Sequence, residues 1–297
     1  MKILLLGANG QVGWELERSL APLGQLQSCN RHTANLEDLD SIKKIIHNYV
    51  PDIIVNAAAY TDVDKAESEE NRAYSINYKA VDFLARESKR IDAWFIHYSS
   101  DYVFDGKKLD PYVELDEPEP LSIYGKSKFK GEQSVVESGC KYIIFRTSWV
   151  YSTRGNNFVK TMIRLGKEKD RLNIVSDQIG APTSARLIAD ISSLCLYRLS
   201  YDKNLAKNVS GIYHLSSSGK TSWYGLAKYI INESKNLGDT FLVGSESIHP
   251  ISTSEYQLPA IRPHNSLLKT QKICNTFSIH LPHWKVPLKR TLQEIYL

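Results

Sequence analysis

The sequence has 297 residues, of which 42% are hydrophobic and 24% charged, and a formal net charge of +4. That length suits one large domain or two closely joined ones, and the composition excludes long disordered stretches. The positive residues are scattered, and the alternating Lys126, Lys128 and Lys130 form no basic face, so we expect no nucleic-acid partner. A mild positive charge suits an anionic small substrate, because it raises the local concentration of that substrate.

Cysteine spacing and hydropathy indicate the compartment. The four cysteines lie far apart and form no CxxC pair, which argues against a zinc site or a disulfide framework and favours a reducing compartment. The apolar core of the first segment, Ile3 to Leu6, is too short for a signal peptide, and no apolar run approaches the roughly 18 residues of a membrane span. We therefore expect a cytoplasmic protein that does not associate with membranes.

Strand and helix patterns alternate through the first half of the chain. Alternating strands and helices imply parallel crossover connections. The expected fold class is therefore α/β, a Rossmann-like doubly wound parallel sheet. The expected elements are a strand at 2–6, a helix at about 14–20, a strand at 26–30, a helix at 39–49, a strand at 52–59, a helix at about 73–90, a strand at 93–99, a helix from about 124 and a strand at 142–147.

The second half is less regular and is interrupted by many prolines and glycines, without repeats or low-complexity tracts. This pattern favours a smaller α/β region that covers a substrate held against the first half. We expect a dinucleotide-binding domain at 1–150 and a mainly substrate-binding domain at 151–297. Some segments of about 175–216 are expected to return to the first domain.

A glycine-rich turn follows the first expected strand at once. Gly7, Gly10 and Gly13 stand at i, i+3 and i+6, with Gln11 and Val12 between the last two. A tight turn needs residues without a Cβ, and a pyrophosphate must approach the backbone closely. The following helix would direct its free N–H groups at that phosphate. The turn predicts a dinucleotide site, and its GxxGxxG spacing is typical of extended short-chain dehydrogenases.

The end of the second expected strand bears on the choice between NADH and NADPH. An acidic residue there would bind the ribose 2′-hydroxyl and repel a 2′-phosphate. Here the residues are Asn30 and Arg31, with no carboxylate, and Arg31 could make a forked contact to a phosphate. The alternative is a surface arginine on a loop. We predict NADPH as the cofactor, with NADH use left open.

Tyr124 and Lys128 form a YxxxK pair at the start of an expected helix. Residues i and i+4 share one helix face, so both side chains can point into one cleft. A nearby lysine charge favours the phenolate, which would lower the tyrosine pKa toward the working range. In a reduction, Tyr124 would donate its proton to the carbonyl oxygen, and Lys128 would hold the nicotinamide ribose. Both residues are thus also expected to contact the cofactor.

Ser100 ends the strand that precedes this helix. Ligands of open α/β sheets bind at the carboxyl edge of the strands, where a serine hydroxyl can polarise the same carbonyl oxygen. The alternative role is a strand-end serine that caps a turn. The glycine turn, Ser100 and the YxxxK pair occur in the order and spacing of a short-chain reductase.

Beyond these motifs, eight stretches match one family. They are GANGQVGWELERSL, VNAAAYTDVDKAESE, HYSSDYVFDG, YGKSKFKGE, FRTSWVY, GNNFVKTM, DQIGAPT and PAIRPHNSLL, of which the last three are the most specific. The sequence therefore resembles the dTDP-4-dehydrorhamnose reductases, almost from end to end. The resemblance implies reduction of the 4-keto group of dTDP-4-dehydro-L-rhamnose to dTDP-L-rhamnose, a precursor of cell-surface polysaccharides such as the O-antigen.

The resemblance also implies roles for particular residues. It makes Ser100, Tyr124 and Lys128 the catalytic trio, and Asp101 and Trp149 contacts of the dTDP-linked 4-keto-6-deoxy sugar. The cofactor contacts that it implies are Gly10, Gln11, Val12, Ala59, Tyr60 and Thr61.

The sequence departs from the family in two places. Family members often carry an acidic residue where Asn30 stands, and the absence of that residue here strengthens the prediction that the cofactor is NADPH. Some members dimerise through magnesium bound by glutamates; Glu15 and Glu294 match, but Arg186 stands where another glutamate would be. An arginine would repel the ion, so we predict no metal and leave monomer and homodimer open.

Other functions remain as alternatives. A nucleotide-sugar 4,6-dehydratase would carry Asp-Glu after the strand end, but Tyr102 follows Asp101 here, and both a dehydratase and an epimerase would recycle a tightly held NAD. A reductase of another nucleotide-linked 4-keto sugar stays open. A non-catalytic NADP-binding subunit, resembling the regulatory subunit of methionine adenosyltransferase, is opposed by the intact trio.

Three further sets of polar residues bear on metal and substrate binding. The first is the acidic cluster Asp62, Asp64 and Glu67, which suits the start of a helix better than a metal site. The second is the pair His280 and His283, which a helix cannot align as metal ligands because Pro282 interrupts it. Arg262 could grip the substrate pyrophosphate in a bidentate manner, with a surface ion pair as its alternative.

Overall fold

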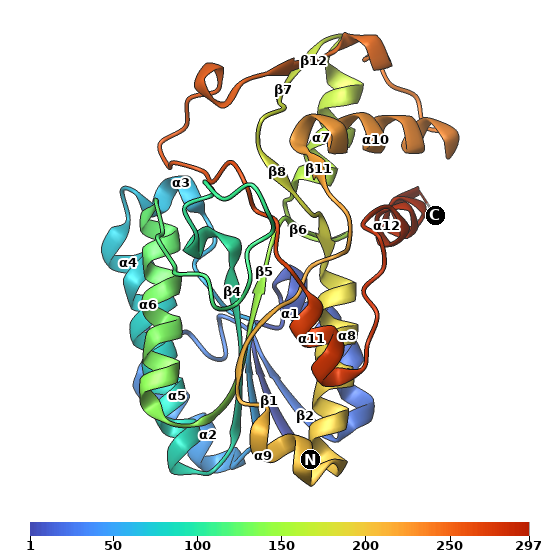
Figure 1. The fold of residues 1–297 in the computed structure, drawn as a ribbon. Helices are drawn as coiled ribbons and strands as arrows, with labels where there is room; N and C mark the ends of the chain where they lie inside the picture. The colour runs from blue at the N-terminus through green and yellow to red at the C-terminus, as the bar shows by residue number, and fades with distance from the viewer. Residues whose placement is uncertain (297) are drawn as a thin grey trace.

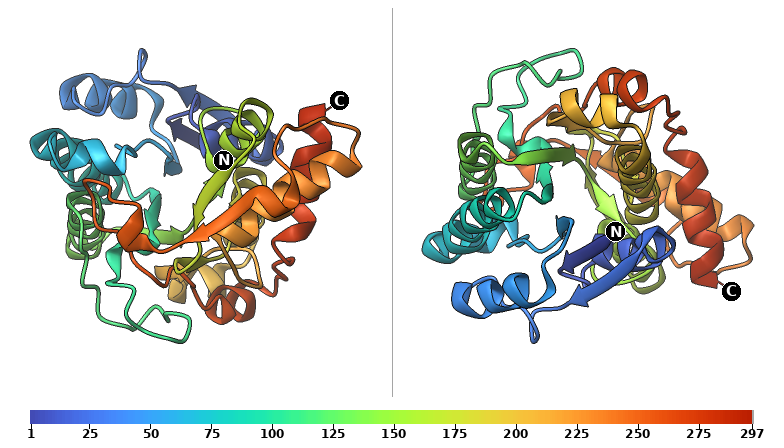
Figure 2. Two further views of the ribbon diagram at one scale, coloured as in Figure 1. Left: turned by 90° about the horizontal axis from the view of Figure 1, so that it is seen from above. Right: turned by 90° about the horizontal axis from the view of Figure 1, so that it is seen from below.

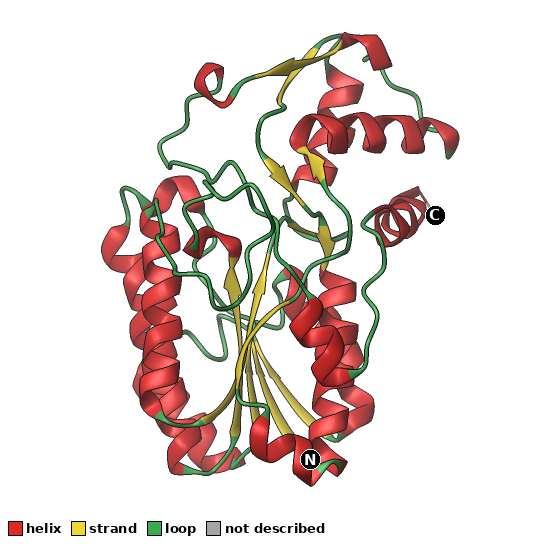
Figure 3. Ribbon diagram, in the orientation of Figure 1, coloured by secondary structure: helices red, strands yellow, loops and turns green. Residues whose placement is uncertain are grey.

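A computed structural model describes residues 1–296 and shows a six-stranded parallel sheet (Figures 1 and 3). The strand order is β10-β5-β4-β3-β1-β2. The strands are β1 (Lys2–Leu6), β2 (Gln25–Cys29), β3 (Ile53–Asn56), β4 (Trp94–Ser100), β5 (Lys141–Thr147) and β10 (Gly211–His214). The α/β fold class with a doubly wound parallel sheet is confirmed.

Helices cover both faces of this sheet (Figure 2). Successive residues of a strand point to opposite faces, so Ile3 packs in the cluster of Leu16 on one face and Leu4 in the cluster of Ile42 on the other. The first face carries α1 (Gln11–Leu20), α8 (Ala185–Tyr201) and α11 (Gln271–Phe277), and the second α2 (Leu39–Tyr49), α5 (Ala80–Arg90) and α6 (Ile123–Ser138).

A second, smaller layer sits above the carboxyl ends of the strands (Figure 1). Its own core joins Val159, Met162, Ile230 and Leu288. It contains α7 (Phe158–Glu168), α10 (Trp223–Asn236) and α12 (Lys285–Tyr296), with the paired strands β6 (Val150–Tyr151) and β9 (Thr183–Ser184), β7 (Leu172–Val175) and β12 (Ile248–Ile251), and β8 (Ile179–Gly180) and β11 (Thr221–Ser222).

Short helices complete the connections. They are α3 (Val63–Ala66), α4 (Glu70–Tyr74), α9 (Lys203–Asn208), the π-helical turn η2 (Ser75–Lys79) and the 3₁₀ turns η1 (Ala21–Leu23), η3 (Asp101–Val103), η4 (Ser245–Ser247) and η5 (Thr253–Glu255). None of the helices described is long and apolar enough to cross a membrane.

The strand order defines where a ligand can enter. The chain runs from β1 outward to β2 and then returns to β3 on the other side of β1. Parallel sheets leave a crevice at such a switch point, beyond the carboxyl ends of the strands. The glycine turn after β1 and the segment after β3 both open onto this crevice.

Candidate active site

The start of α6 is pressed against the end of β4. The hydroxyl of Ser122 caps the helix by accepting from the Gly125 N–H at 3.1 Å. A Cβ on Gly125 would lie 2.2 Å from the Tyr102 carbonyl oxygen, so only glycine permits this approach. The Tyr124 ring stands edge-on to the Tyr102 ring, with centroids 5.5 Å apart. Gly125 thus lets Tyr124 reach the end of β4, a role that the sequence analysis missed.

Ser100 and Tyr124 meet at this point. A side-chain hydrogen bond between Ser100 and Tyr124 acts to lower the tyrosine pKa. The Ser100 hydroxyl also donates to Asp101 at 2.9 Å and accepts from the Tyr102 N–H at 3.1 Å. Its capping of the turn η3 and its place beside Tyr124 are therefore compatible, although the sequence analysis set them against each other.

The expected lowering of the Tyr124 pKa is wrong. Burial raises the pKa of Tyr124 to about 12, the Asp101 charge adds to the rise, and the bond with Ser100 opposes it. The ammonium of Lys128 instead donates to the Tyr98 carbonyl oxygen at 2.5 Å. Tyr124 therefore keeps its proton at neutral pH, which is the form that an acid needs.

Lys128 is buried in the interior beside this pair. Burial lowers the pKa of Lys128 to about 8, and the Glu132 charge opposes that shift. Its Nζ also lies 3.5 Å from Nε2 of His97, whose own pKa burial holds well below the usual range. Glu132, one helical turn along α6, makes a buried ion pair with Arg146 at 2.6 Å.

Asp101 lies next to Ser100 and has an unused oxygen. Its Oδ2 is buried and has no hydrogen-bond partner among the described residues. Burial raises the pKa of Asp101 to about 6, while side-chain hydrogen bonds with Ser266 and Ser100 act in the opposite direction. An unpartnered oxygen in a buried site suits a ligand hydroxyl.

The glycine turn has the geometry that close packing requires. Gly7 has φ +84°, and a Cβ on Gly13 would lie 2.0 Å from the Gly7 carbonyl oxygen. Gly10 caps α1 without any side-chain hydrogen bond, and the first turn of α1 holds no acidic residue. The first N–H groups of α1 therefore face the crevice without a side-chain cap. The Gln11 side chain accepts from Asn157 of the upper layer at 2.9 Å.

The end of β2 presents one arginine to solvent. Asn30 is engaged in its own turn, accepting from the His32 N–H at 2.8 Å. Arg31 is 66% exposed and lies 3.4 Å from the Glu37 carboxylate, which also pairs with Arg72 at 3.3 Å. Arg72 is a second basic group near this strand end that the sequence analysis missed.

The segment after β3 is tied to the catalytic helix by one buried amide. This segment contains Ala59, Tyr60 and Thr61. Asn77 of the turn η2 accepts from the Tyr60 N–H at 2.9 Å and donates to the Tyr60 carbonyl and to the Ser127 hydroxyl, each at 3.1 Å. Ser127 in turn donates to the Tyr124 carbonyl at 2.8 Å. No local pattern in the sequence marks Asn77, because its partners lie 17 and 50 residues away.

Trp149 comes two residues after Thr147, which pairs in register with Ser100. The indole is stacked on that of Trp223, with centroids 3.6 Å apart. Trp149 is therefore at the carboxyl edge of the sheet, close to Ser100, and part of the core of the upper layer. The family resemblance points to Trp149, whereas no motif in the sequence marks its partner Trp223.

Arg262 makes an ion pair in this structure. Its guanidinium donates to both carboxylate oxygens of Asp64, at 3.1 and 2.8 Å. Its charge also acts on the neighbouring Tyr102. The remaining acids of that segment have helix-start roles: Asp62 caps α3, and Glu67 accepts from the first N–H of α6 at 2.9 Å. The described residues include no group of three His, Cys, Asp or Glu side chains placed to hold a metal ion.

Arg186 joins the two glutamates that the family resemblance connects with magnesium. It pairs with Glu15 at 3.3 Å and with Glu294 more closely. We expect EDTA to leave the thermal unfolding midpoint unchanged and Arg186→Ala to lower it by a few degrees, because the guanidinium already supplies the positive charge between the carboxylates. Thermal unfolding of both proteins with and without EDTA tests this, and a drop caused by EDTA in the unaltered protein would contradict it.

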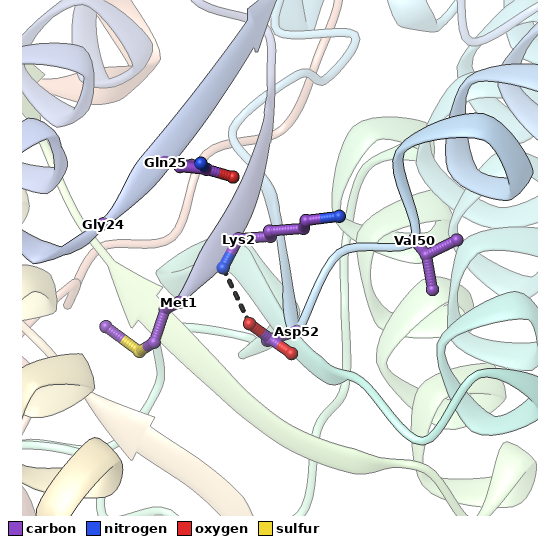
Figure 4. Close-up of a pocket in the computed structure, with 6 residues that line it drawn as sticks. All are labelled: Met1, Lys2, Gly24, Gln25, Val50 and Asp52. Atoms are coloured by element: carbon purple, nitrogen blue, oxygen red, sulfur yellow. Dashed lines mark hydrogen bonds between the residues drawn. The ribbon is translucent and has the colours of Figure 1, made fainter.

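One open hollow lies at the other end of the sheet. Figure 4 shows it at the amino ends of β1 and β2, where the Lys2 N–H donates to Asp52 at 2.7 Å. Met1, Gly24, Gln25 and Val50 also line it. Since Ser100 ends its strand, this hollow is a strand length away from the candidate site and plays no part in the chemistry below.

Sheet order, glycine turn, strand-end serine and the Tyr124–Lys128 pair together define an extended short-chain dehydrogenase/reductase. The family described as RmlD substrate binding domain matches residues 1–297, and the chain belongs to that family.

Individual relatives agree with this membership. The dTDP-4-dehydrorhamnose reductase of Escherichia coli is 44% identical over 300 residues, covering 100% of this chain and 98% of that protein. The enzyme of the same name from Burkholderia thailandensis is 46% identical over 295 residues, covering 99% of each. A crystal structure of the Bacillus anthracis dTDP-4-dehydrorhamnose reductase in complex with NADP has a TM-score of 0.87 and 34% identity, covering 99% of each chain. The resemblance seen in the sequence is confirmed.

Proposed function

We propose that this protein reduces the 4-keto group of dTDP-4-dehydro-L-rhamnose with NADPH and forms dTDP-L-rhamnose. The main support for this proposal is that Ser100 and the protonated Tyr124 lie together at the crevice of a dinucleotide-binding sheet. Full-length relatives at 44% and 46% identity bear the name of this reaction. We infer that the product serves cell-surface polysaccharide synthesis and that the reaction takes place in the cytoplasm.

The residues of the crevice fit a bound dinucleotide. The uncapped start of α1 offers N–H groups of Gln11, Val12 and Gly13 to a pyrophosphate, and its dipole favours negative charge there. The segment Ala59 to Thr61 lies at the opposite wall, held by Asn77. NADPH bound in this crevice supplies the hydride that reduces the ketone.

The chain's own residues then handle the proton. Tyr124 donates its proton to the carbonyl oxygen as the carbon accepts the hydride, so the ketone becomes an alcohol and Tyr124 a phenolate. Ser100 polarises the same oxygen by hydrogen bonding, which stabilises the negative charge that develops on it. Lys128, which lies on the same helix and now donates to the Tyr98 carbonyl, would hold the ribose of the bound nicotinamide.

Substrate contacts come from the upper side of the crevice. The unpartnered oxygen of Asp101 accepts a hydrogen bond from a sugar hydroxyl, and Trp149 contacts the sugar. Arg262 is held by Asp64 beside Tyr102, from where it can reach the diphosphate. In this proposal residues 1–150 form the dinucleotide-binding domain, on whose sheet α8 and β10 also pack, and most of residues 151–297 form the substrate-binding domain.

The direct test is NADPH oxidation, followed by absorbance, with a panel of dTDP- and UDP-linked 4-keto sugars and identification of the product. We expect the largest kcat/KM with dTDP-4-dehydro-L-rhamnose and dTDP-L-rhamnose as the product. Preference for another keto sugar would replace the proposed substrate. NADPH binding without turnover on any sugar would indicate a binding subunit instead.

Arg31 provides a separate prediction about the cofactor. We expect Arg31→Ala to weaken NADPH binding about tenfold and NADH binding less than twofold, since only the 2′-phosphate needs the guanidinium. Glu37→Gln is the matched variant, because removal of the competing carboxylate should tighten NADPH. Dissociation constants from fluorescence titration measure both effects. If Arg31→Ala weakens the binding of both cofactors equally, this side chain does not bind the 2′-phosphate.

A further inference from the structure

The backbone of Trp149 adopts a conformation that large side chains rarely accept. Its φ is +49°, in the left-handed region, where a bulky residue is an outlier. Such conformations persist only where the surroundings fix them, and they concentrate at functional sites. The structure shows what fixes this residue, because both faces of its indole are covered by protein.

Trp223 covers the first face. The two indoles are 10° from parallel, with centroids 3.6 Å apart. Trp223 is itself held, because its N–H donates to the Gln178 side chain at 3.1 Å and its ring contacts Phe158 with centroids 4.6 Å apart. Trp223 is therefore a fixed support rather than a mobile neighbour.

Gly180 covers the second face. A Cβ on Gly180 would lie 2.4 Å from Cε2 of Trp149, 2.7 Å from Cζ2 and 2.8 Å from Nε1. A point in the ring plane outside the indole would be nearer to Cζ2 and Nε1 than to Cε2, so the glycine sits above the ring. Trp223 and Gly180 cannot share one face at these distances. The Trp149 indole is therefore enclosed between them.

An enclosed indole can meet a ligand only at its edge. The Trp149 N–H makes no hydrogen bond with any of the described residues, and its nitrogen is not among the buried unpartnered atoms, so solvent or a ligand can reach it. Because both faces of the ring are covered, neither the sugar nor the base can stack on Trp149.

We propose that Trp223 and Gly180 are positioning residues that hold Trp149 edge-on to the substrate, so that its N–H donates to an oxygen of the sugar nucleotide. This inference rests on the proposed function, and it says how that site recognises its substrate. An N–H held in one direction selects for an acceptor oxygen at one place on the sugar nucleotide, which a stacking contact would not do.

Gly180 is connected through its neighbour Ile179 to the part of the site that contains Asp101. Ile179, next to Gly180, donates its N–H to the His264 carbonyl and accepts from the Ser266 N–H, each at 2.8 Å. The Ser266 side chain in turn bonds to Asp101. Gly180 therefore lies on the sugar side of the crevice.

The test is a double-mutant cycle on the KM for the keto sugar. We expect Trp223→Ala to raise that KM about tenfold and Trp223→Phe about twofold, because Phe keeps a stacking ring. NADPH affinity should stay within about twofold in both, which also reports that the variants are folded. In a Trp149→Ala background, Trp223→Ala should cause no further change, since its effect passes through the missing indole.

Gly180→Ala tests the other face. Its Cβ must push the indole aside, so we expect a rise in KM of about tenfold or more, again abolished in the Trp149→Ala background. Gly211→Ala is the matched control, because the nearest atom to its Cβ would be the flexible Lys272 Nζ at 3.5 Å. That variant should behave like the unaltered protein.

The outcomes separate this inference from the proposed function. If the unaltered protein oxidises no NADPH with any keto sugar, the proposed function fails. If the protein is active but Trp223→Ala leaves the KM unchanged, or raises it equally with and without Trp149, the positioning role is overturned. The stacked pair itself has a signature independent of turnover: an exciton couplet in circular dichroism that both Trp149→Ala and Trp223→Ala should remove.

Discussion

Replacing Tyr124 by phenylalanine is expected to lower kcat by about 10²- to 10⁴-fold, the range that a positioned general acid contributes. The ring and its edge-on contact with Tyr102 remain, so the loss is that of the proton alone. Burial raises the pKa of Tyr124 to about 12, so the hydroxyl holds its proton throughout the neutral range. Steady-state rates with saturating keto sugar and NADPH measure the change.

Tyr102→Phe is the matched control for this experiment. Tyr102 is a second tyrosine beside Tyr124, in the turn η3 after β4, and desolvation raises its pKa as well. Only the backbone N–H of Tyr102 bonds to Ser100, and its hydroxyl does not, so that hydroxyl should be dispensable for turnover. NADPH binding should survive in both variants. Full activity in Tyr124→Phe, or an equal loss in Tyr102→Phe, would remove Tyr124 from the acid role.

Arg146→Met is expected to destabilise the protein by about 3–5 kcal/mol, the cost of leaving one member of a buried ion pair uncompensated. Arg146 and Glu132 are 2% and 1% exposed and are joined by three hydrogen bonds of 2.6 to 3.2 Å. The Glu132 carboxylate would remain in the interior without its partner. Equilibrium unfolding in urea measures the free energy of unfolding.

Two variants show whether that loss comes from the stranded charge. The double variant Arg146→Met with Glu132→Leu should recover part of the loss, because no charge then stays buried. Arg164→Met breaks an exposed pair with Glu168, 60% and 49% exposed, and should cost less than about 1 kcal/mol. A double variant less stable than Arg146→Met alone would mean that lost packing, and not the unpaired charge, accounts for most of the loss of stability.

Regular elements were predictable because their apolar residues recur with the period of the element. The strand at 2–6 and the helix at 39–49 have the bounds that the sequence predicts. The expected helix at 73–90 is instead α4, the π-helical turn η2 and α5. Asn77 lies in that turn and bonds to the Tyr60 backbone, which a local sequence pattern does not reveal.

The site was predictable to the extent that it follows from topology. Ser100 and Tyr124 meet because parallel strands end at one edge of the sheet and the helix after β4 begins there. Contacts between side chains were not predictable in this way. Arg262 pairs with Asp64, 198 residues away, and Lys128 donates to a backbone carbonyl of β4 rather than acting on Tyr124.

The single amide of Asn77 links the wall of the dinucleotide crevice to the helix that carries the acid. A shift of the Tyr60 segment on cofactor binding would be transmitted through Ser127 to Tyr124, and the reverse also holds. The protein therefore has little freedom to bind NADPH with its proton donor out of place. Geometry of this kind is set during folding, so that little reorganisation is left for the moment of reaction.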